Sequence, residues 1–456
     1  MPLQKNQVLT LRVERLSSDG SGVAHSSDGE TVFIPGAAPG DEARVRIVKD
    51  CKRYAFGILD EVLTPSPDRI PVDCAVAGPC GGCSLRHLDY AAELRAKQEN
   101  VADAFARIGG LDVPVLPIVG SPEVNRYRNK VQFPVGVDKS GKPCIGFYAG
   151  RTHRIVPCPD CRLQPGVLNE IGNALCAFFA EKGIQPYSEE TGRGLVRHIF
   201  LRRGAHSGQI MVCLVCTRAK LPSAEELCTR LKAQFAEITT ILLNVNAKNT
   251  NVILGTETHT LYGPGYIEDT LCGVPVQLGP LSFYQVNTLA AEQLYGIAAQ
   301  YAQLTPDDLL LDLYCGMGTI GLSMAAHCRE LIGVEIVPEA IESAKANAAR
   351  MGADVAAKSR FFCADAGQAA TRLAAEGLHP DIVMLDPPRK GCDEATLSAV
   401  VRMSPRRVVY VSCNPATAAR DAAWLEQNGY HAEKVQPVDL FPRTRHCECV
   451  LSLSKV

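Results

Sequence analysis

The sequence predicts an α/β protein whose C-terminal part is a doubly wound, mainly parallel sheet, preceded by a small OB-type β-barrel and a central α+β domain. Three observations support this prediction. Residues 7–63 hold short runs of alternating apolar residues bounded by glycine. Beyond residue 278, apolar runs of strand length alternate with stretches of helical length. The chain of 456 residues is also too long for one hydrophobic core.

The composition is that of an ordinary globular protein, with 46% hydrophobic and 21% charged residues. No apolar run reaches membrane-spanning length, and Met1 to Arg15 has polar residues where a signal peptide needs an apolar core. We therefore expect a cytoplasmic monomer with no membrane partner. The net charge of −2 does not decide for or against nucleic acid, because one face can be basic while the whole molecule is not.

Nineteen cysteines are present, an odd number, and most lie singly inside apolar segments. This distribution does not indicate a disulfide framework. In a reducing compartment these thiols stay free for packing, catalysis or metal binding.

Short strands predict the N-terminal barrel, a fold that often binds RNA. The strand-like runs are 8–13, 31–36, 42–48 and 56–59. This segment resembles a TRAM domain, a small barrel found in several RNA-modifying enzymes. A candidate nucleic-acid face is formed by Arg44, Arg46, Lys49, Lys52 and Arg53. Acidic residues nearly balance these cations, so a mixed solvated surface is an equally good interpretation.

A cysteine cluster follows the linker 64–67. Cys74, Cys80 and Cys83 form a CX5CX2C pattern in which Gly81 and Gly82 let the backbone wrap closely. Three thiols at this density indicate a metal site, and a tetrahedral site or an iron–sulfur cluster needs a fourth ligand. Cys158 and Cys161 are the candidates. Ligand type alone does not separate zinc from a 4Fe-4S cluster, and unconnected structural cysteines are the alternative.

The rest of the central domain, to residue 265, begins with an amphipathic helix predicted over 90–109. Residues 125–133 then alternate basic, amide and aromatic side chains on a predicted strand. Further arginines follow at Arg151, Arg154, Arg193, Arg197, Arg202 and Arg203. Cations interleaved with aromatic rings suit a folded single-stranded RNA, whereas a solvated charged face is the alternative.

The C-terminal part, 266–456, predicts repeated βα units. Its expected strands are 309–313, 331–334, 360–363, 381–385 and 408–412, and its expected helices are 288–301, 319–327, 338–351 and 417–428. Ligands of such sheets bind beyond the carboxyl ends of the strands. The last of these strands delivers Cys413 to that edge, so its thiol faces the ligand unless it is only a small buried apolar residue.

A glycine turn, Gly316-Met-Gly318-Thr-Ile-Gly321, matches the dinucleotide-binding fingerprint, so an iron–sulfur oxidoreductase using a nicotinamide cofactor is one alternative. Glu335, at the end of the next strand, suits the ribose hydroxyls of a dinucleotide or of S-adenosylmethionine. Asp386-Pro387-Pro388 is a turn familiar from methyltransferases that act on nitrogen. There an aromatic residue follows the prolines, and Arg389 in its place disfavours that chemistry.

A thiol and a carboxylate together suit methylation of uracil at carbon 5. Carbon 5 becomes nucleophilic when a thiolate adds to carbon 6, and a base must later remove the carbon 5 proton. Cys413 is the candidate nucleophile and Glu448 the candidate base, around a flipped base and a methyl donor. For Glu448, a surface charge on an edge strand is the alternative.

Taken together, these motifs resemble the RNA (uracil-5-)-methyltransferase family, over nearly the whole chain. The resemblance implies a Rossmann-like methyltransferase domain in which Cys413 is the nucleophile and Glu448 the base. It places Asp386 beside the uracil or the donor and implies S-adenosylmethionine contacts from Gln285, Tyr314, Glu335 and Asp365. It also implies a 4Fe-4S cluster on Cys74, Cys80, Cys83 and Cys161.

The barrel together with the cysteine cluster favours 23S rRNA over tRNA as the substrate, because tRNA-acting relatives commonly lack both. A non-catalytic RNA-binding protein or chaperone with an inactive methyltransferase fold is a third alternative.

Overall fold

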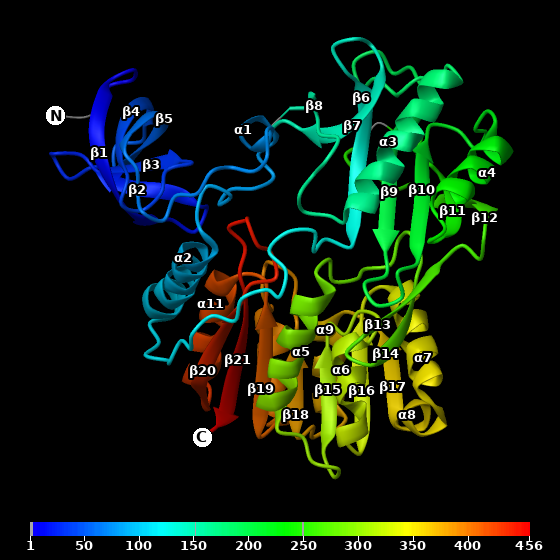
Figure 1. Cartoon of the computed structure of the whole chain (residues 1–456). Coiled ribbons are helices and arrows are strands. Elements are labelled where there is room, and N and C mark those ends of the chain that lie inside the picture. Colours follow the sequence, from blue (N-terminus) through cyan, green and yellow to red (C-terminus); the bar gives the residue numbers. More distant parts are fainter. Residues whose placement is uncertain (1–2, 151, 249) are drawn as a thin grey trace.

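The computed structural model describes residues 3–150, 152–248 and 250–456. Figure 1 shows an N-terminal barrel and a central sheet side by side, with the C-terminal sheet below both. The N-terminal end of the chain belongs to the barrel, and the chain ends in a strand of the C-terminal sheet. The barrel and the central sheet each have a hydrophobic cluster of their own, and a cluster of the C-terminal part also includes Phe200, Met211, Cys213 and Leu242 of the central sheet.

The barrel is closed in the order β1-β2-β3-β5-β4, as predicted for an OB-type fold. Its strands are β1 (Val8–Leu16), β2 (Ser21–His25), β3 (Thr31–Pro35), β4 (Glu42–Asp50) and β5 (Tyr54–Thr64). Alternate residues point inward, so Val32, Val45 and Ala55 are buried. A Cβ atom at Gly57 would lie 2.3 Å from Val45 Cγ1, so only glycine allows β4 and β5 to approach this closely.

Two helices connect the barrel to the central sheet, after the short α1 (Ala77–Cys80). The predicted helix over 90–109 is observed as α2 (Tyr90–Asp103) and a π-helical turn, η1 (Ala104–Gly109). Val101, Ala104 and Phe105 belong to the hydrophobic cluster of the C-terminal sheet. The helix therefore packs between the barrel and that sheet, as seen at the left of Figure 1.

The central sheet has seven strands in the order β12-β11-β10-β9-β6-β7-β8, of which only β10 and β11 are parallel neighbours. Helices α3 and α4 pack against the sheet through the same hydrophobic cluster. The elements are β6 (Lys130–Val137), β7 (Pro143–Tyr148), β8 (Ile155–Pro157), α3 (Gly166–Glu181), β9 (Val196–Arg203), β10 (Ile210–Cys216), α4 (Ala224–Gln234), β11 (Ile238–Val245) and β12 (Glu257–Tyr262).

The RNA-binding surface predicted for this sheet is wrong in several of its residues. Residues 125–129 precede β6 rather than forming part of it, and Tyr127 is buried, with its hydroxyl donating to the Pro442 carbonyl at 3.0 Å. Arg197 and Arg202 are also buried, and their guanidinium groups donate to backbone carbonyls inside the protein. These side chains satisfy internal acceptors, so they do not face solvent. Arg151 lies outside the described residues.

The C-terminal sheet has seven strands in the order β17-β16-β15-β18-β19-β21-β20, as the predicted βα units require. Its first five strands are parallel, whereas β21 runs antiparallel to both neighbours. The seven strands are β15 (Leu309–Leu313), β16 (Glu330–Glu335), β17 (Ser359–Cys363), β18 (Ile382–Leu385), β19 (Arg407–Ser412), β20 (Tyr430–Val438) and β21 (Glu448–Lys455). A separate hairpin precedes the sheet, formed by β13 (Ile267–Leu271) and β14 (Val274–Leu278).

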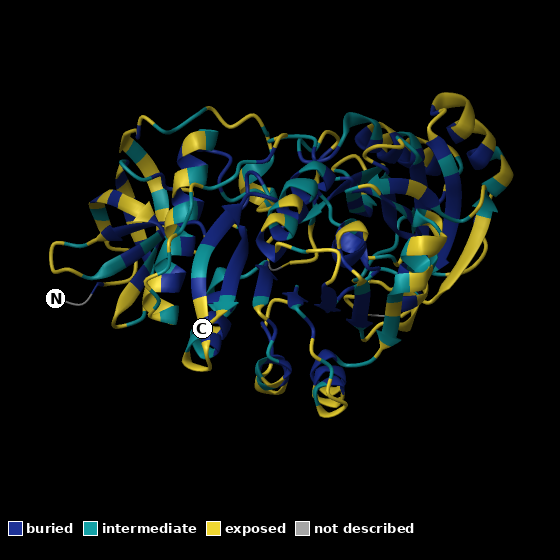
Figure 2. Cartoon of the chain, turned by 90° about the horizontal axis from the view of Figure 1, so that it is seen from below, coloured by how far each residue is buried: buried dark blue, intermediate teal, exposed yellow. Residues whose placement is uncertain are grey.

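Helices cover both faces of this sheet, and two hydrophobic clusters lie between the helices and the strands. In Figure 2 the strands of the interior are buried, while the surface helices carry exposed residues on one side. The helices are α5 (Thr288–Ala302), α6 (Thr319–Met324), η2 (Ala325–His327), α7 (Pro338–Met351), α8 (Ala353–Lys358), α9 (Ala366–Ala375), α10 (Glu394–Met403) and α11 (Pro415–Gln427). Across the described residues, every helix is too short or too polar to span a bilayer.

Candidate active site

The two residues expected to carry the chemistry lie at the carboxyl edge of the C-terminal sheet. Ser412, the last residue of β19, pairs with Cys449 of the antiparallel strand β21. Cys413 and Glu448, one position beyond each partner, therefore emerge at the same edge. Asp386 lies at the same edge. The strand β18 is the other neighbour of β19 and runs parallel to it, and Asp386 directly follows its last residue, Leu385.

The charges of these groups act on one another. Burial and the charges of Glu448 and Asp386 raise the pKa of the Cys413 thiol to about 11, and Arg389 opposes this rise. Burial and Asp386 raise the pKa of Glu448 to about 8, again opposed by Arg389. Burial alone raises the pKa of Asp386 to about 7. The site thus holds one thiol and two carboxyl groups in a poorly solvated place, with one cation beside them.

The other half of the edge, above β15, β16 and β17, holds the predicted cofactor contacts. Tyr314 follows β15 with a positive φ of 67°, and its hydroxyl lies 3.4 Å from Thr396 Oγ1. Glu335 ends β16, and its carboxylate accepts hydrogen bonds from the backbone N–H groups of Gly316, Ile336 and Val337. Asp365 follows β17 and caps α9 by accepting from Gln368 N at 3.1 Å. The glycine turn, Glu335 and Asp365 therefore lie at the carboxyl edge of the sheet, where ligands of such folds bind.

Gln285 lies in the loop that precedes α5. Its side chain hydrogen-bonds with the Tyr295 hydroxyl, which also lies 3.5 Å from Thr319 Oγ1. Side chains of the central domain hold the loop in place: Asn129 Nδ2 donates to the Gln285 carbonyl at 2.7 Å, and Arg202 donates to the Gly279 and Ser282 carbonyls. Contacts from the central domain therefore fix the position of Gln285.

Asp312 is a further acidic group that the sequence reasoning missed. It lies within β15, is 1% exposed, and accepts from Gly321 N at 3.0 Å through Oδ2. Among the described residues its Oδ1 has no hydrogen-bond partner. Burial raises the pKa of Asp312 to about 8, and the negative charges of Asp386 and Glu335 contribute to this rise. The hydrogen bond from Gly321 has the opposite effect. The sequence signal that could have identified it is a single acidic residue inside the apolar run Leu309–Leu313.

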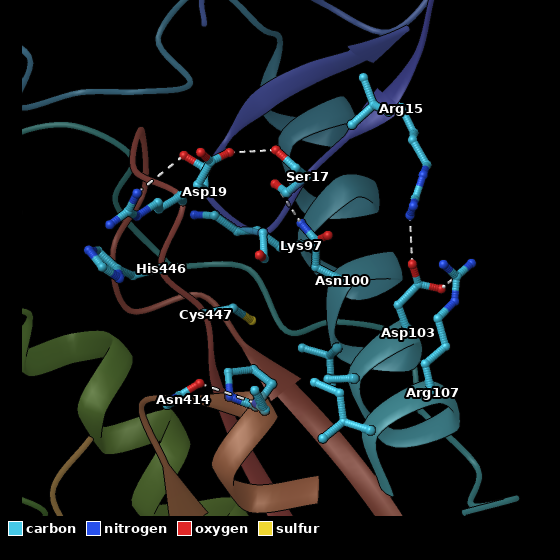
Figure 3. Close-up of a pocket in the computed structure, with 18 of the residues that line it drawn as sticks. Arg15, Ser17, Asp19, Lys97, Asn100, Asp103, Arg107, Asn414, His446 and Cys447 are labelled. Atoms are coloured by element: carbon cyan, nitrogen blue, oxygen red, sulfur yellow. Dashed lines mark hydrogen bonds and ion pairs between the residues drawn. The ribbon is translucent and has the colours of Figure 1, made fainter. Parts of the chain in front are cut away.

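A cavity of about 650 Å³ opens above Cys413, between the barrel, α2 and the loop that precedes β21. Figure 3 shows Arg15 and Arg107 on one side of it and Asn414 and His446 on the other. Five Lys or Arg side chains and two Asp side chains line the cavity, and of these cations Lys97 is neutralised by the buried carboxylates of Glu93 and Asp439. Its volume lies within the usual range of ligand sites, and its charge favours an anionic ligand.

The predicted metal ligands lie in a separate place, around α1 and the turn after β8. The charges of Cys161 and Cys74 add to the effect of burial in raising the pKa of Cys80, so these thiols are neighbours. A hydrogen bond from Cys158 lowers the pKa of Cys161 to about 6. In the part of the chain that the structure describes, however, no three His, Cys, Asp or Glu side chains converge as a group that would hold a metal ion. The donor chemistry suits a thiophilic metal, whereas the observed side-chain arrangement does not fit one.

Two sequence-family profiles match the chain. The TRAM domain matches residues 2–59, and the tRNA (uracil-5-)-methyltransferase profile matches residues 206–456. An uncharacterized RNA methyltransferase of Halalkalibacterium halodurans is 43% identical over 99% of this chain and 98% of its own length. A second uncharacterized RNA methyltransferase, from Listeria monocytogenes, is 42% identical over the same shares of the two chains.

Among solved structures, the tRNA (uracil-54, C5)-methyltransferase of Pyrococcus abyssi, in complex with S-adenosyl-L-homocysteine, is similar with a TM-score of 0.78. It is 26% identical, and the match covers 98% of this chain and 100% of the other.

The doubly wound sheet, the TRAM barrel and these relatives define the class of protein, an RNA methyltransferase. More narrowly, the chain belongs to the tRNA (uracil-5-)-methyltransferase family. Family membership disfavours a nicotinamide-dependent oxidoreductase, the alternative that the glycine turn left open.

Proposed function

We propose that this protein transfers a methyl group from S-adenosylmethionine to carbon 5 of a uridine in RNA, through a covalent adduct between Cys413 and the base. The observation that carries the proposal is the convergence of Cys413, Glu448 and Asp386 at the edge of the sheet, beneath a cavity with a basic wall. A phosphodiester chain suits this wall, and a flipped base suits the buried thiol and carboxylate.

Cys413 starts the reaction. Its thiolate, formed by loss of the thiol proton to solvent, adds through Sγ to carbon 6, and the electron pair of the C5=C6 bond moves onto O4 as an enolate. Carbon 5 then takes the methyl group, and S-adenosylhomocysteine leaves. The Glu448 carboxylate accepts the carbon 5 proton, the C5=C6 bond re-forms, and Sγ departs as a thiolate. Arg389 opposes the rise of the Cys413 pKa, so it favours the thiolate that the first step needs.

The proposed S-adenosylmethionine contacts are Gln285, Tyr314, Glu335 and Asp365, with Asp386 between them and Cys413. When bound, this cofactor supplies the electrophilic methyl group. Two observations support the fit: Gly316 has a positive φ of 55° with open space where a Cβ would stand, and Glu335 lies beside it at the strand end. A glycine turn next to an acidic group is the usual cradle for an adenosine moiety.

For the RNA we keep 23S rRNA as the substrate that the sequence resemblance implies. tRNA is the second candidate, and one observation favours it. The Pyrococcus abyssi enzyme, a tRNA methyltransferase by name, matches 98% of this chain. This match spans the barrel, so the presence of a barrel does not by itself favour rRNA over tRNA.

A 4Fe-4S cluster on Cys74, Cys80, Cys83 and Cys161 is also a proposal, which rests on the family resemblance and on the thiol donor set. We give it no step in the reaction, since methyl transfer needs no electron, and assign it to folding of the central domain. Iron and sulfide analysis with the visible absorption spectrum tests it, and stoichiometric zinc in a colourless protein would refute it.

The proposed domains are 1–63, 64–265 and 266–456. In support, the barrel, the central sheet and the C-terminal sheet each lie almost wholly within one of them. We also keep the proposal of a cytoplasmic monomer, which gel filtration and fractionation of cells would test.

The testing experiment follows transfer of labelled methyl groups to unmodified 23S rRNA and to tRNA transcripts. We expect 5-methyluridine with the native protein, and a loss of at least about 1,000-fold with Cys413→Ala. Cys144→Ala, a half-buried cysteine in the central sheet, is the matched control and should keep full activity. Label only in tRNA would keep the chemistry and change the substrate. Label in neither RNA, or full activity of Cys413→Ala, would refute the proposal.

A further inference from the structure

A row of side chains crosses the outer face of the barrel from β1 to β4. In the strand register, Arg15 pairs with Val23, Val23 with Phe33, Phe33 with Phe56, and Phe56 with Lys49. Register partners in a sheet point to the same face, and the intervening residues fill the barrel interior. The barrel thus carries a strip with a cation at each end and apolar side chains between them, in which Val23 is buried and the aromatic side chains are not.

Three aromatic rings gather in this strip. Phe33, Tyr54 and Phe56 contact one another with ring centroids 5.7 to 5.8 Å apart. None of the three is buried, and Tyr54 is 40% exposed. Exposed rings that touch each other leave part of their apolar surface to solvent, which is unfavourable unless a ligand covers it.

The strip is continuous with the cavity above Cys413. Arg15, Val23 and Phe33 line that cavity together with Arg389 and Cys413 itself. Figure 3 shows Arg15 and Arg107 on either side of Asp103, and both guanidinium groups contact its carboxylate, at 2.6 and 3.3 Å. Two cations share one anion here, so the mouth of the cavity keeps a positive charge.

We propose that the accessible side chains of this strip, Arg15, Phe33, Tyr54, Phe56 and Lys49, bind the unpaired nucleotides of the RNA that flank the target uridine. Their bases stack on the three rings, and their phosphates lie near Arg15, Arg107 and Lys49. The inference rests on the proposed function, because it assumes that the target uridine is bound at Cys413 and that the RNA chain extends from there. A flipped target base requires unpaired neighbours, and unpaired bases expose the π-faces that such rings bind.

The charge distribution favours RNA over a protein partner. The cations at the two ends of the strip suit a polyanion whose bases are apolar. Further along β4 and β5, by contrast, Arg44 and Arg46 are paired with Glu61 and Asp60 at 2.8 and 2.7 Å. The barrel cations predicted to face RNA are thus partly neutralised there, and the strip beside the cavity offers the better surface.

Binding of a fluorescein-labelled single-stranded RNA of about 12 nucleotides, measured by anisotropy, tests the proposal on the full-length protein. Phe33→Leu and Tyr54→Leu keep apolar volume but remove the π-face, and each should weaken binding by about 5- to 100-fold. Phe33→Tyr keeps a ring and should bind nearly as well as the native protein. Ile58→Ala, on the same face of β5 and 48% exposed, is the control and should leave binding unchanged.

The salt dependence separates stacking from charge. Lys49→Gln should reduce the slope of log affinity against log salt by about 0.7, whereas Phe33→Leu should leave that slope unchanged. S-adenosylhomocysteine binding and the unfolding temperature should stay native in all variants, so a misfolded barrel would be detected.

Native binding by both leucine variants would overturn the proposal, as would ring-dependent binding of duplex RNA as tight as that of the single strand. Loss of self-association instead of RNA binding in these variants would assign the strip to a second copy of the chain and would also overturn it. If the native protein binds RNA through these rings but methylates no uridine, the proposed function is refuted and RNA binding by the strip is supported. If the leucine variants bind and methylate as the native protein does, RNA binding by the strip is refuted and the proposed function is supported.

Discussion

Cys413 and Glu448 meet at one edge of the sheet because their neighbours Ser412 and Cys449 are paired across two antiparallel strands. A parallel β21 would have carried Glu448 to the opposite edge. Glu448 is only 6% exposed, and its charge acts directly on the Cys413 thiol. The reversal of a single strand therefore assembles the pair of groups that the proposed chemistry requires.

Glu448→Gln should trap the covalent intermediate. Without a carboxylate to accept the carbon 5 proton, the methylated adduct cannot eliminate Cys413. We expect a protein–RNA complex stable to denaturing electrophoresis, and turnover reduced by at least about 100-fold. Cys413→Ala should form no such complex, and neither should the double variant. A Glu448→Gln protein that turns over at the native rate would contradict the assignment of the base.

The reactivity of Cys413 should depend on the charges around it. Its thiol has a pKa raised to about 11, because of burial and the charges of Glu448 and Asp386, and Arg389 opposes the rise. Removing a negative charge in Glu448→Gln should move the pH dependence of Cys413 alkylation by iodoacetamide to lower pH. Removing the cation in Arg389→Gln should move it to higher pH. Mass spectrometry of the Cys413 peptide provides the measurement, and equal profiles for the two variants would contradict the prediction.

Stability should fall with pH because of Glu448. Its pKa in the folded protein is about 8, above the ordinary value, so the folded state holds a proton that the unfolded state releases near 4.5. The stabilising contribution of the protonated form is complete below about pH 4.5 and is lost as the pH rises through about 8. Glu448→Gln should therefore unfold at a higher temperature than the native protein at about pH 9 and near the native temperature at about pH 5. The gain in the free energy of unfolding has an upper limit of about 5 kcal/mol.

Glu433→Gln is the contrasting variant for this measurement. Burial opposes ionisation of Glu433, but hydrogen bonds from Ser452 and Arg407 lower its pKa. The ionised Glu433 stabilises the protein fully when the pH is above its pKa in the unfolded state. This contribution is lost as the pH falls through its lower pKa in the folded state. Glu433→Gln should therefore destabilise the protein at neutral and high pH, the opposite of the effect at Glu448.

Arg202 should control cofactor affinity without touching the cofactor. Its guanidinium group donates to the Gly279 and Ser282 carbonyls at 2.8 and 2.7 Å, which holds the loop that carries Gln285. The single ammonium group of Arg202→Lys does not match this forked geometry. We expect the KM for S-adenosylmethionine to rise about 10-fold with a smaller change in kcat. Arg193→Lys, at an exposed position, is the control, and an unchanged KM in Arg202→Lys would contradict this role.

Lys97 should be essential for stability. Its ammonium group donates to Glu93 Oε1 at 2.7 Å and to Asp439 Oδ1 at 2.8 Å, and both carboxylate side chains are fully buried. Lys97→Met removes the cation of Asp439 and leaves Glu93 with only the Arg443 guanidinium at 3.6 Å, so it should lower the free energy of unfolding by about 3–5 kcal/mol. Adding Glu93→Gln should recover part of the loss. Lys345→Met, which breaks an exposed pair with Glu342, should cost less than about 0.5 kcal/mol in the same denaturant titration.

Much of this protein could be predicted from local sequence. The periodicity of apolar residues predicted the barrel and the doubly wound sheet, because each strand and helix must present an apolar face to a core. The helix Pro338–Met351 has the predicted bounds, since proline begins it and Gly352 follows it. The positions of Cys413 and Asp386 at strand ends were also predictable, because a strand leads directly into each residue.

Only the tertiary structure decided which of these residues meet. Arginines in β9 that resemble an RNA-binding surface in the sequence are buried, because carbonyls from distant loops accept their hydrogen bonds. Glu448 reaches Cys413 through strand reversal, and Arg15, Phe33 and Phe56 align through the register of the barrel. Strand pairing joins residues that are far apart in the chain, so local periodicity, which determines each element, contains no information about its partner.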